Sequence, residues 1–255
     1  MLVYANHMGA EQNLDWHAAA ASAIDWWIDA GVDASVDEAP RDWLAAIVAP
    51  PPATRRSAAL AEAAPEPVLP ASLDAFLAWR QSDAAPEGEW PGAFLTSQGP
   101  ADASLLVLVD VPEREDTESG QLLSGAAGRL FDRMLAAIGQ SRTSIHLVAV
   151  CAKRPIAGRI APEIEERLIE IARHHITLAA PKRVLLLGNA PSRALLAADV
   201  ARARGSLRAV NLTGGKSDVT VEAIASFHPR FLLERPAQKA EAWRDLQLLI
   251  GGLDR

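Results

Sequence analysis

Two side chains capable of proton chemistry stand close behind apolar runs of the sequence. Asp110 directly follows the run at residues 104–109, and His228 comes two residues after the run at 219–226. The first run is made of Leu and Val without alternation, which predicts a parallel strand buried on both faces. In open α/β sheets, ligands bind beyond the carboxyl ends of the strands, where loop N–H groups and helix N-termini meet anionic or carbonyl groups. Both side chains are therefore candidates for a site at that edge.

The loop behind Asp110 carries a motif. Residues 109–139 read VDVPEREDTESGQLLSGAAGRLFDRMLAAIG, a polar loop with glycines that runs into a helix. This segment resembles the first motif of the uracil-DNA glycosylase superfamily, and of its iron–sulfur branch in particular. The positions that keep the motif are Pro112, Glu115, Asp116, Gly120, Gly125, Ala127, Gly128 and Asp132.

The same loop departs from the motif at several positions. Val109 and Glu113 replace two glycines, and bulky side chains resist the backbone geometry that glycine allows. Asp110 stands where the family has a glutamate. Leu123 replaces the aromatic residue that stacks on an extruded base. Glu113 also adds a negative charge that would repel phosphate.

Two further segments extend the resemblance. Residues 226–249, SFHPRFLLERPAQKAEAWRDLQLL, are similar to the family's late His-Pro motif. The exit of the run at 145–151, VAVCAKRPIAGR at residues 148–159, is similar to a family segment in which an asparagine amide reads the edge of uracil, and Ala149 stands at that position. Asn189 matches a turn that follows a third strand, at 183–188. The resembling segments span roughly residues 104–249.

The resemblance implies a role for each matched residue. His228 would donate a hydrogen bond to the charge that builds on the base, and Asp110 would orient a water molecule. The implied base pocket consists of Pro112, Leu123, Ala149 and Asn189. The implied DNA-binding residues are Arg154, Arg159, Pro229, Arg230 and Phe231, of which Arg159 would either face phosphate or simply be solvated.

Two functions remain open on these residues. The first is a diverged DNA-repair protein that binds DNA weakly to moderately at the cleft between Asp110 and His228, with weak, altered or absent base excision. The second is a non-catalytic, glycosylase-derived interaction subunit of a DNA repair or replication complex. The missing aromatic ring at Leu123 and the missing amide at Ala149 would each cost about 1–3 kcal/mol of base-binding free energy. The second function is therefore also consistent with the sequence.

The cysteine content bears on cofactors. The branch that this chain resembles holds a four-iron cluster on four cysteines. This chain has one cysteine, Cys151, which excludes an internal disulfide and a multi-cysteine metal site. Lys153 stands where the family has one cluster cysteine, and Arg167 stands near the position of another. We expect neither a metal nor another cofactor.

The order of elements predicts an α/β fold, a three-layer α/β/α sandwich with a mainly parallel central sheet as in uracil-DNA glycosylases. Helices are expected at residues 72–81, 127–138, 162–180 and 190–198. The stretch TGGKS at 213–217 lacks the spacing of a phosphate loop and is expected to be a hairpin turn. His174 and His175 would place favourable charge at a helix C-terminus.

The N-terminal part differs in charge from the rest. Residues 1–100 carry a net charge of −10, and residues 101–255 carry +3. We predict an acidic, tryptophan-containing helical appendage at 1–48, a Pro/Ala-rich linker at 49–71 and an α/β domain at 72–255. The appendage would hold a helix at 16–28 and a short helix at 42–48.

The first of these helices carries Trp26 and Trp27. It would either dock on the core or present these rings to a protein partner. No run of the sequence approaches the ~18 apolar residues of a membrane span. We therefore expect a cytoplasmic protein with no membrane association.

Overall fold

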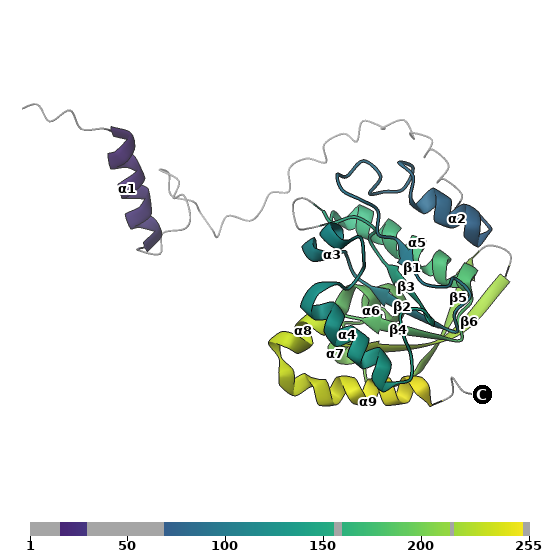
Figure 1. Ribbon diagram of the computed structural model, residues 1–255. Coiled ribbons are helices and arrows are strands. Elements are labelled where there is room, and N and C mark those ends of the chain that lie inside the picture. Colours follow the sequence, from purple (N-terminus) through teal and green to yellow (C-terminus); the bar gives the residue numbers. More distant parts are fainter. Residues whose placement is uncertain (1–15, 30–68, 156–159, 215–216, 252–255) are drawn as a thin grey trace, which may run out of the picture. The chain divides into compact units, whose positions relative to one another are not determined.

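Figure 1 shows the computed structural model, which describes residues 16–29, 69–155, 160–214 and 217–251. The chain divides into two compact units, residues 1–64 and residues 65–255. The helix predicted at 42–48, most of the predicted linker and Arg159 lie outside the described residues. Nowhere in the described ranges is a helix long and apolar enough to cross a bilayer.

The described part of the first unit is helix α1 (Trp16–Asp29), which confirms the helix predicted from residue 16. Its described side chains, at residues 17 and 20–26, are exposed. Ile24 and Trp26 are 60% and 67% exposed, respectively. The helix therefore presents large apolar side chains without a covering element among the described residues of its own unit.

The second unit is built on a mostly parallel sheet. Within the described residues it has six strands in the order β1-β3-β2-β4-β6-β5. The strands are β1 (Ser97–Gln98), β2 (Leu105–Val109), β3 (Ile145–Ala149), β4 (Arg183–Leu187), β5 (Arg208–Gly214) and β6 (Ser217–Ser226). The four inner strands are mutually parallel, and β1 and β5 pair antiparallel at the two edges. The β5–β6 pairing confirms the predicted hairpin.

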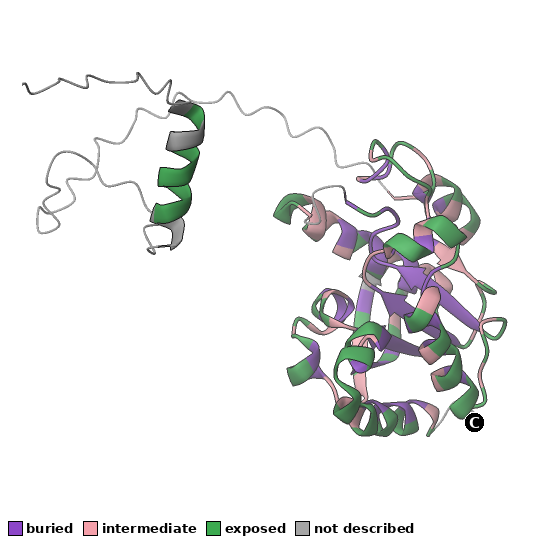
Figure 2. Ribbon diagram, turned by 60° about the vertical axis from the view of Figure 1, so that its left-hand side comes forward, coloured by how far each residue is buried: buried purple, intermediate pink, exposed green. Residues whose placement is uncertain are grey.

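Helices cover both faces of the sheet. The remaining helices of this unit are α2 (Leu73–Arg80), α3 (Arg114–Ser119), α4 (Gly125–Ala137), α5 (Pro162–Ala179), α6 (Asn189–Leu196), α7 (Val200–Ala203), α8 (Pro229–Glu234), the 3-10 helix η1 (Pro236–Gln238) and α9 (Lys239–Ile250). Helices α2 and α5 lie on one side of the sheet and α4 and α9 on the other (Figure 1). Figure 2 shows the buried strands between the partly exposed helices. The predicted three-layer α/β/α architecture is confirmed.

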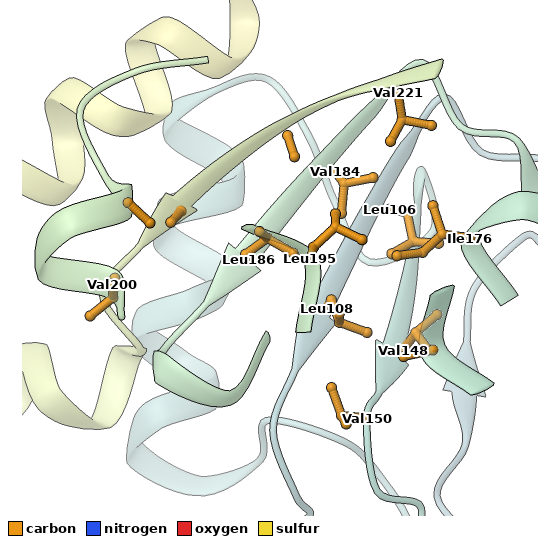
Figure 3. Close-up of a cluster of buried hydrophobic side chains, with 14 of the residues drawn as sticks. Leu106, Leu108, Val148, Val150, Ile176, Val184, Leu186, Leu195, Val200 and Val221 are labelled. Carbon is orange, nitrogen blue, oxygen red and sulfur yellow. The ribbon is translucent and has the colours of Figure 1, made fainter. Parts of the chain in front are cut away.

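The continuous apolar runs produce this layering because neighbouring side chains of a strand point to opposite faces. In β2, Leu106 and Leu108 pack toward α5 and α6, where they meet Ile176 and Leu195 (Figure 3). Leu105, Val107 and Val109 pack toward α4 and α9. Every residue of β2, β3 and β4 is buried, as expected for parallel strands covered on both sides.

The predicted role of His175 is wrong. His175 is buried near the end of α5, and its Nε2 lies 3.0 Å from the Nε2 of His146. Burial, followed by the neighbouring His146, lowers the pKa of His175 to about 3. The ring is therefore uncharged at neutral pH and contributes a buried hydrogen bond instead of charge at the helix C-terminus.

We expect the second unit to fold without the first. Leu69 packs against the core and the carbonyl of Pro70 lies 2.8 Å from His174 Nε2, so the cut belongs before these residues. A chain that lacks residues 1–64 should unfold cooperatively at the temperature of the full-length protein, because the compact units divide there. Differential scanning calorimetry measures this, and an insoluble or non-cooperative product would assign the N-terminal part to the core.

Candidate functional site

A cleft of about 480 Å³ lies at the carboxyl ends of β2, β4 and β6, which are adjacent parallel strands. Its size is typical of a small-ligand site. The predicted residues that line it are Asp110, Arg154, Asn189, His228, Arg230 and Phe231. Glu113, Gly188 and Phe227 also contribute. We call this the strand-end cleft.

Other predicted pocket residues lie elsewhere. Pro112, Leu123, Ala149 and Pro229 are buried and are not part of the cleft lining. Ala149 is paired with Val109 inside the sheet, and its side chain joins the core beneath α4 and α9. Leu123 packs into the same core. An alignment fixes the order of residues but not the face to which each side chain points, and the side chains of Leu123 and Ala149 point into the core.

A buried carboxylate organises the loop between β2 and α4. Asp116 Oδ2 accepts a hydrogen bond from the backbone N–H of Glu113 at 3.0 Å. Its Oδ1 accepts from both the backbone N–H and the hydroxyl of Ser124, each at 2.7 Å. The loop is thereby closed on itself, and Glu113 is held at the N-terminus of α3 beside the cleft. Sequence reasoning matched Asp116 to a motif and missed this structural task.

His228 is fixed in one neutral tautomer. Its Nδ1 accepts a hydrogen bond from the backbone N–H of Arg230 at 3.2 Å, at the start of α8. Burial, and then the positive charge of Arg230, lowers the pKa of His228 to about 4. At neutral pH the ring is uncharged, and because Nδ1 is an acceptor, the proton is on Nε2. His228 therefore offers a neutral N–H donor at the strand-end cleft.

The position of His228 depends on the end of β4. The backbone N–H of Gly188 donates to the carbonyl of Ser226 at 3.0 Å, which ties the ends of β4 and β6 together. Gly188 has φ of +101°, a conformation that side-chain-bearing residues rarely adopt. The strands deliver Asn189 and His228 to the same cleft.

Asp110 supplies a partly buried carboxyl group. Burial raises its pKa, Arg193 lowers it, Glu165 raises it and Arg230 lowers it, in decreasing order of effect. The net direction is upward, so this carboxylate holds a proton more readily than an exposed aspartate. It can orient a water molecule or accept a proton from it. Asp110 follows β2 and His228 follows β6, and β4 lies between these two strands.

Charges of both signs occur at the cleft. Arg230 Nη1 lies 3.3 Å from Glu113 Oε1, and Arg154 Nη1 donates to the carbonyl of Pro112 at 3.4 Å. Burial raises the pKa of Glu113, while Arg230 opposes this effect. An incoming phosphate would therefore compete with Glu113 for Arg230.

The cleft also contains two stacked aromatic rings. The ring centroids of Phe227 and Phe231 are 5.0 Å apart, with the planes inclined by 28°. The sequence prediction placed Phe231 among the DNA-binding residues and overlooked Phe227. The available signal was an aromatic residue immediately before the His-Pro pair.

The residues present do not fit a four-iron cluster. Lys153, at one cluster position of the resembling family, donates to the carbonyls of Gly88 and Trp90 at 2.8 and 2.7 Å. The only cysteine, Cys151, donates its thiol proton to the carbonyl of Lys153, and burial raises the pKa of the thiol to about 12. A cluster needs several thiolates, so no reaction step is assigned to one.

A buried ion pair lies beside Lys153. Arg80 Nη1 is 2.5 Å from Glu87 Oε1, and both side chains are almost fully buried. Glu87 Oε1 also accepts from the backbone N–H of Ala152 at 2.8 Å, and Arg80 Nη2 donates to the carbonyl of Val150 at 3.0 Å. These contacts attach α2 and the loop after it to the segment that follows β3.

The lowered pKa of His228 predicts acid sensitivity. Its folded pKa of about 4 lies below the ordinary value of 6.5, so the unfolded chain binds more protons between these pH values. The contribution of His228 to the free energy of unfolding is therefore fully present above pH 6.5. It is lost as the pH falls toward 4, by about 1.4 kcal/mol per pH unit at most. Asp110 and Glu113 act in the opposite sense at lower pH because their pKa values are raised.

This contribution can be isolated with a variant. His228→Asn keeps a helix-capping side chain and removes the imidazole. In urea unfolding, the wild type should lose on the order of 1–2 kcal/mol more than His228→Asn between pH 7 and pH 5. Equal losses in the two chains would contradict a neutral, partly buried His228.

Comparison with known proteins identifies relatives of the α/β unit. The family model described as "Uracil DNA glycosylase superfamily" matches residues 96–247. The type-4 uracil-DNA glycosylase of Pyrobaculum aerophilum is 26% identical over 180 residues, which cover 69% of this chain and 92% of the relative. The type-4 uracil-DNA glycosylase of Archaeoglobus fulgidus is 26% identical over 161 residues, covering 60% of this chain and 79% of the relative.

Proposed function

Because the chain belongs to the uracil-DNA glycosylase superfamily, we propose that it is a DNA-repair protein that engages a base of DNA at the strand-end cleft, in the cytoplasm, with weak or altered base excision. The observation that carries this proposal is the neutral His228, whose proton is fixed on Nε2 by the hydrogen bond from Arg230. Fixed donors of this kind stabilise charge that develops in a transition state.

The excision step uses two side chains of the cleft. As the bond between the sugar C1′ and the base nitrogen breaks, its electron pair moves onto the base, and His228 Nε2–H donates a hydrogen bond to the oxygen that gains charge. Asp110 accepts a proton from water as the water oxygen bonds to C1′. The free base then takes up a proton from solvent. The raised pKa of Asp110 favours this proton transfer.

DNA would be held mainly through the rim of the cleft. Arg154 and Arg230 are exposed and can meet phosphate, while Pro229 starts the short helix α8 that carries Phe231 at its surface. Glu113 already pairs with Arg230, so a phosphate contact at Arg230 contributes less binding free energy. Binding is therefore weak to moderate and weakens as the salt concentration rises. Arg159 stays a candidate for phosphate contact.

The excision rate should be low. Leu123 has no aromatic ring and Ala149 has no amide, and both side chains lie in the core. These two positions therefore give the cleft neither a stacking ring nor an edge-reading amide. Each missing contact costs about 1–3 kcal/mol, and the two losses together slow the reaction by roughly 30- to 25,000-fold if nothing replaces them.

A second candidate function rests on α1. Ile24 and Trp26 are exposed on an acidic segment, and exposed aromatic side chains are typical of protein interfaces. In this function the chain is a non-catalytic interaction subunit that recruits a repair or replication partner through α1.

The two functions separate in one set of assays. The wild type and the chain lacking residues 1–64 are incubated with oligonucleotides that contain uracil, hypoxanthine or xanthine, and alkali then reveals abasic sites. A gel shift over a salt series measures DNA binding in parallel. Slow excision or salt-dependent binding retained by the shortened chain supports the first function. A chain that neither shifts DNA nor excises any base contradicts it and leaves the interaction subunit.

A further inference from the structure

The aromatic pair in the strand-end cleft is a rigid, partly open surface. Phe227 is 9% exposed and forms its inner layer, while Phe231 is 38% exposed and forms its outer layer. The guanidinium carbon of Arg204 lies 5.0 Å from the Phe227 ring centroid. Large aromatic side chains at a cleft are suited to stacking because every nucleobase has a π-face.

Ion pairs centred on a buried carboxylate hold this surface in place. Arg204 makes two hydrogen bonds to the buried carboxylate of Asp245, at 3.1 and 3.2 Å, and a third to Glu241 at 2.5 Å. Asp245 also accepts from the hydroxyl of Ser226, the last residue of β6, at 2.9 Å. The segment that carries Phe227 is thus anchored on α9, and Phe227 gives the Phe231 ring a fixed partner to stack against.

Asn189 adds a directed hydrogen-bond donor. Its Oδ1 accepts the backbone N–H of Val200 at 3.0 Å. The acceptor must be the oxygen, because an amide NH₂ group cannot accept that hydrogen bond. The NH₂ group of Asn189 is therefore left to donate to a ligand, and Asn189 lines the same cleft as Phe227 and Phe231.

The strand register brings the stack and the amide together. Leu187 of β4 is the pairing partner of Ser226 of β6, so Asn189 and His228 each follow the paired position by two residues. The hydrogen bond from Gly188 to Ser226 continues the pairing beyond the strand. An aromatic face, an amide donor and the His228 N–H therefore occur on one side of the cleft.

We propose that this side of the cleft, formed behind β4 and β6, recognises an unpaired nucleobase that carries a carbonyl group. The base stacks on the exposed ring of Phe231, and the Asn189 NH₂ group donates to its carbonyl oxygen. Thymine, uracil, hypoxanthine and xanthine have such an oxygen, and adenine has none. The inference rests on the proposed function, since it presumes that DNA reaches this cleft, and it assigns the base contacts to residues other than Leu123 and Ala149.

The test compares two single-stranded oligonucleotides of equal length and charge, one of thymidine and one with abasic sites throughout. Fluorescence anisotropy at fixed salt measures the affinity of each. Phe231→Leu should weaken thymidine binding by about 5- to 150-fold and leave abasic binding unchanged, because base–aromatic stacking contributes about that factor. Phe231→Trp should retain thymidine binding. Leu233→Ala, at an exposed position of the same helix outside the cleft, should resemble the wild type.

Asn189→Asp tests the amide. An aspartate at this position still accepts the Val200 N–H, so the local fold is kept, but it presents an oxygen where the NH₂ group was. Thymidine binding should fall more than abasic binding, because the abasic strand reports the added charge alone. Thermal melting of each variant verifies folding.

The outcomes separate this inference from the proposed function. Equal wild-type affinity for the two oligonucleotides, or equal weakening of both by Phe231→Leu, overturns base recognition at Phe231 while DNA binding stands. A loss in Asn189→Asp that is the same for both strands overturns the role of the amide. A wild type that binds neither strand overturns both the inference and DNA binding at the cleft.

Discussion

His228→Ala is expected to slow base excision by about 10²- to 10³-fold, the usual effect of removing one preorganised donor to developing charge. The ring is neutral because burial lowers the pKa of His228 to about 4, and its proton is on Nε2 because Nδ1 accepts from Arg230. No proton transfer is then needed before the donor acts. Single-turnover excision of the most susceptible base in the uracil, hypoxanthine and xanthine panel measures the effect.

A second variant separates chemistry from folding. His228→Asp retains an acceptor for the Arg230 N–H at the start of α8 but has no N–H to donate. It should be as slow as His228→Ala while melting closer to the wild type. Leu233→Ala serves as the unaffected surface control. An excision rate indifferent to both changes at His228 would remove this residue from the mechanism.

Glu87→Ala is expected to destabilise the α/β unit by about 3–5 kcal/mol, because it removes one partner of a buried ion pair. The Arg80 guanidinium would keep its hydrogen bond to the Val150 carbonyl and lose its counter-charge, and the Ala152 N–H would lose its acceptor. Urea unfolding at pH 7 gives the free energy directly. Glu89→Ala, at an exposed position two residues away, should change it by no more than about 0.5 kcal/mol.

The size of this effect comes from the orphaned charge and not from the pair itself. The double variant Arg80→Met/Glu87→Leu should therefore recover much of the loss, since replacing a buried pair by apolar side chains is often neutral. A double variant as unstable as Glu87→Ala would show that the loop after α2 depends on the charges for its conformation. A Glu87→Ala chain as stable as Glu89→Ala would contradict the buried network.

The layered fold was predictable because the inner strands are short, continuous apolar runs. Helix α3 was not, because its sequence REDTES has no apolar periodicity. It forms because Asp116 accepts the Glu113 N–H at its start and Gly120 ends it with φ of +70°. Capping interactions thus determine that α3 is helical, although its side-chain pattern does not indicate a helix.

The site was predictable only in part, for a related reason. Residues that directly follow the strands, such as Asp110 and His228, reach the strand-end cleft because parallel strands end at one edge. Ala149 and Leu123 were assigned by alignment with a family motif, and their side chains lie in the core. The contribution of Phe227 depends on a ring–ring contact that the sequence does not specify.

The central claim, that an unpaired base enters the strand-end cleft, is tested most directly by photocrosslinking. A single-stranded oligonucleotide with one 5-iodouracil is bound to the full-length protein, irradiated and digested, and the crosslinked residue is located by mass spectrometry. We predict attachment at Phe231 or His228, lost when excess unmodified oligonucleotide is added. Crosslinks confined to α1, or to residues of the α/β unit outside the cleft, would contradict the account.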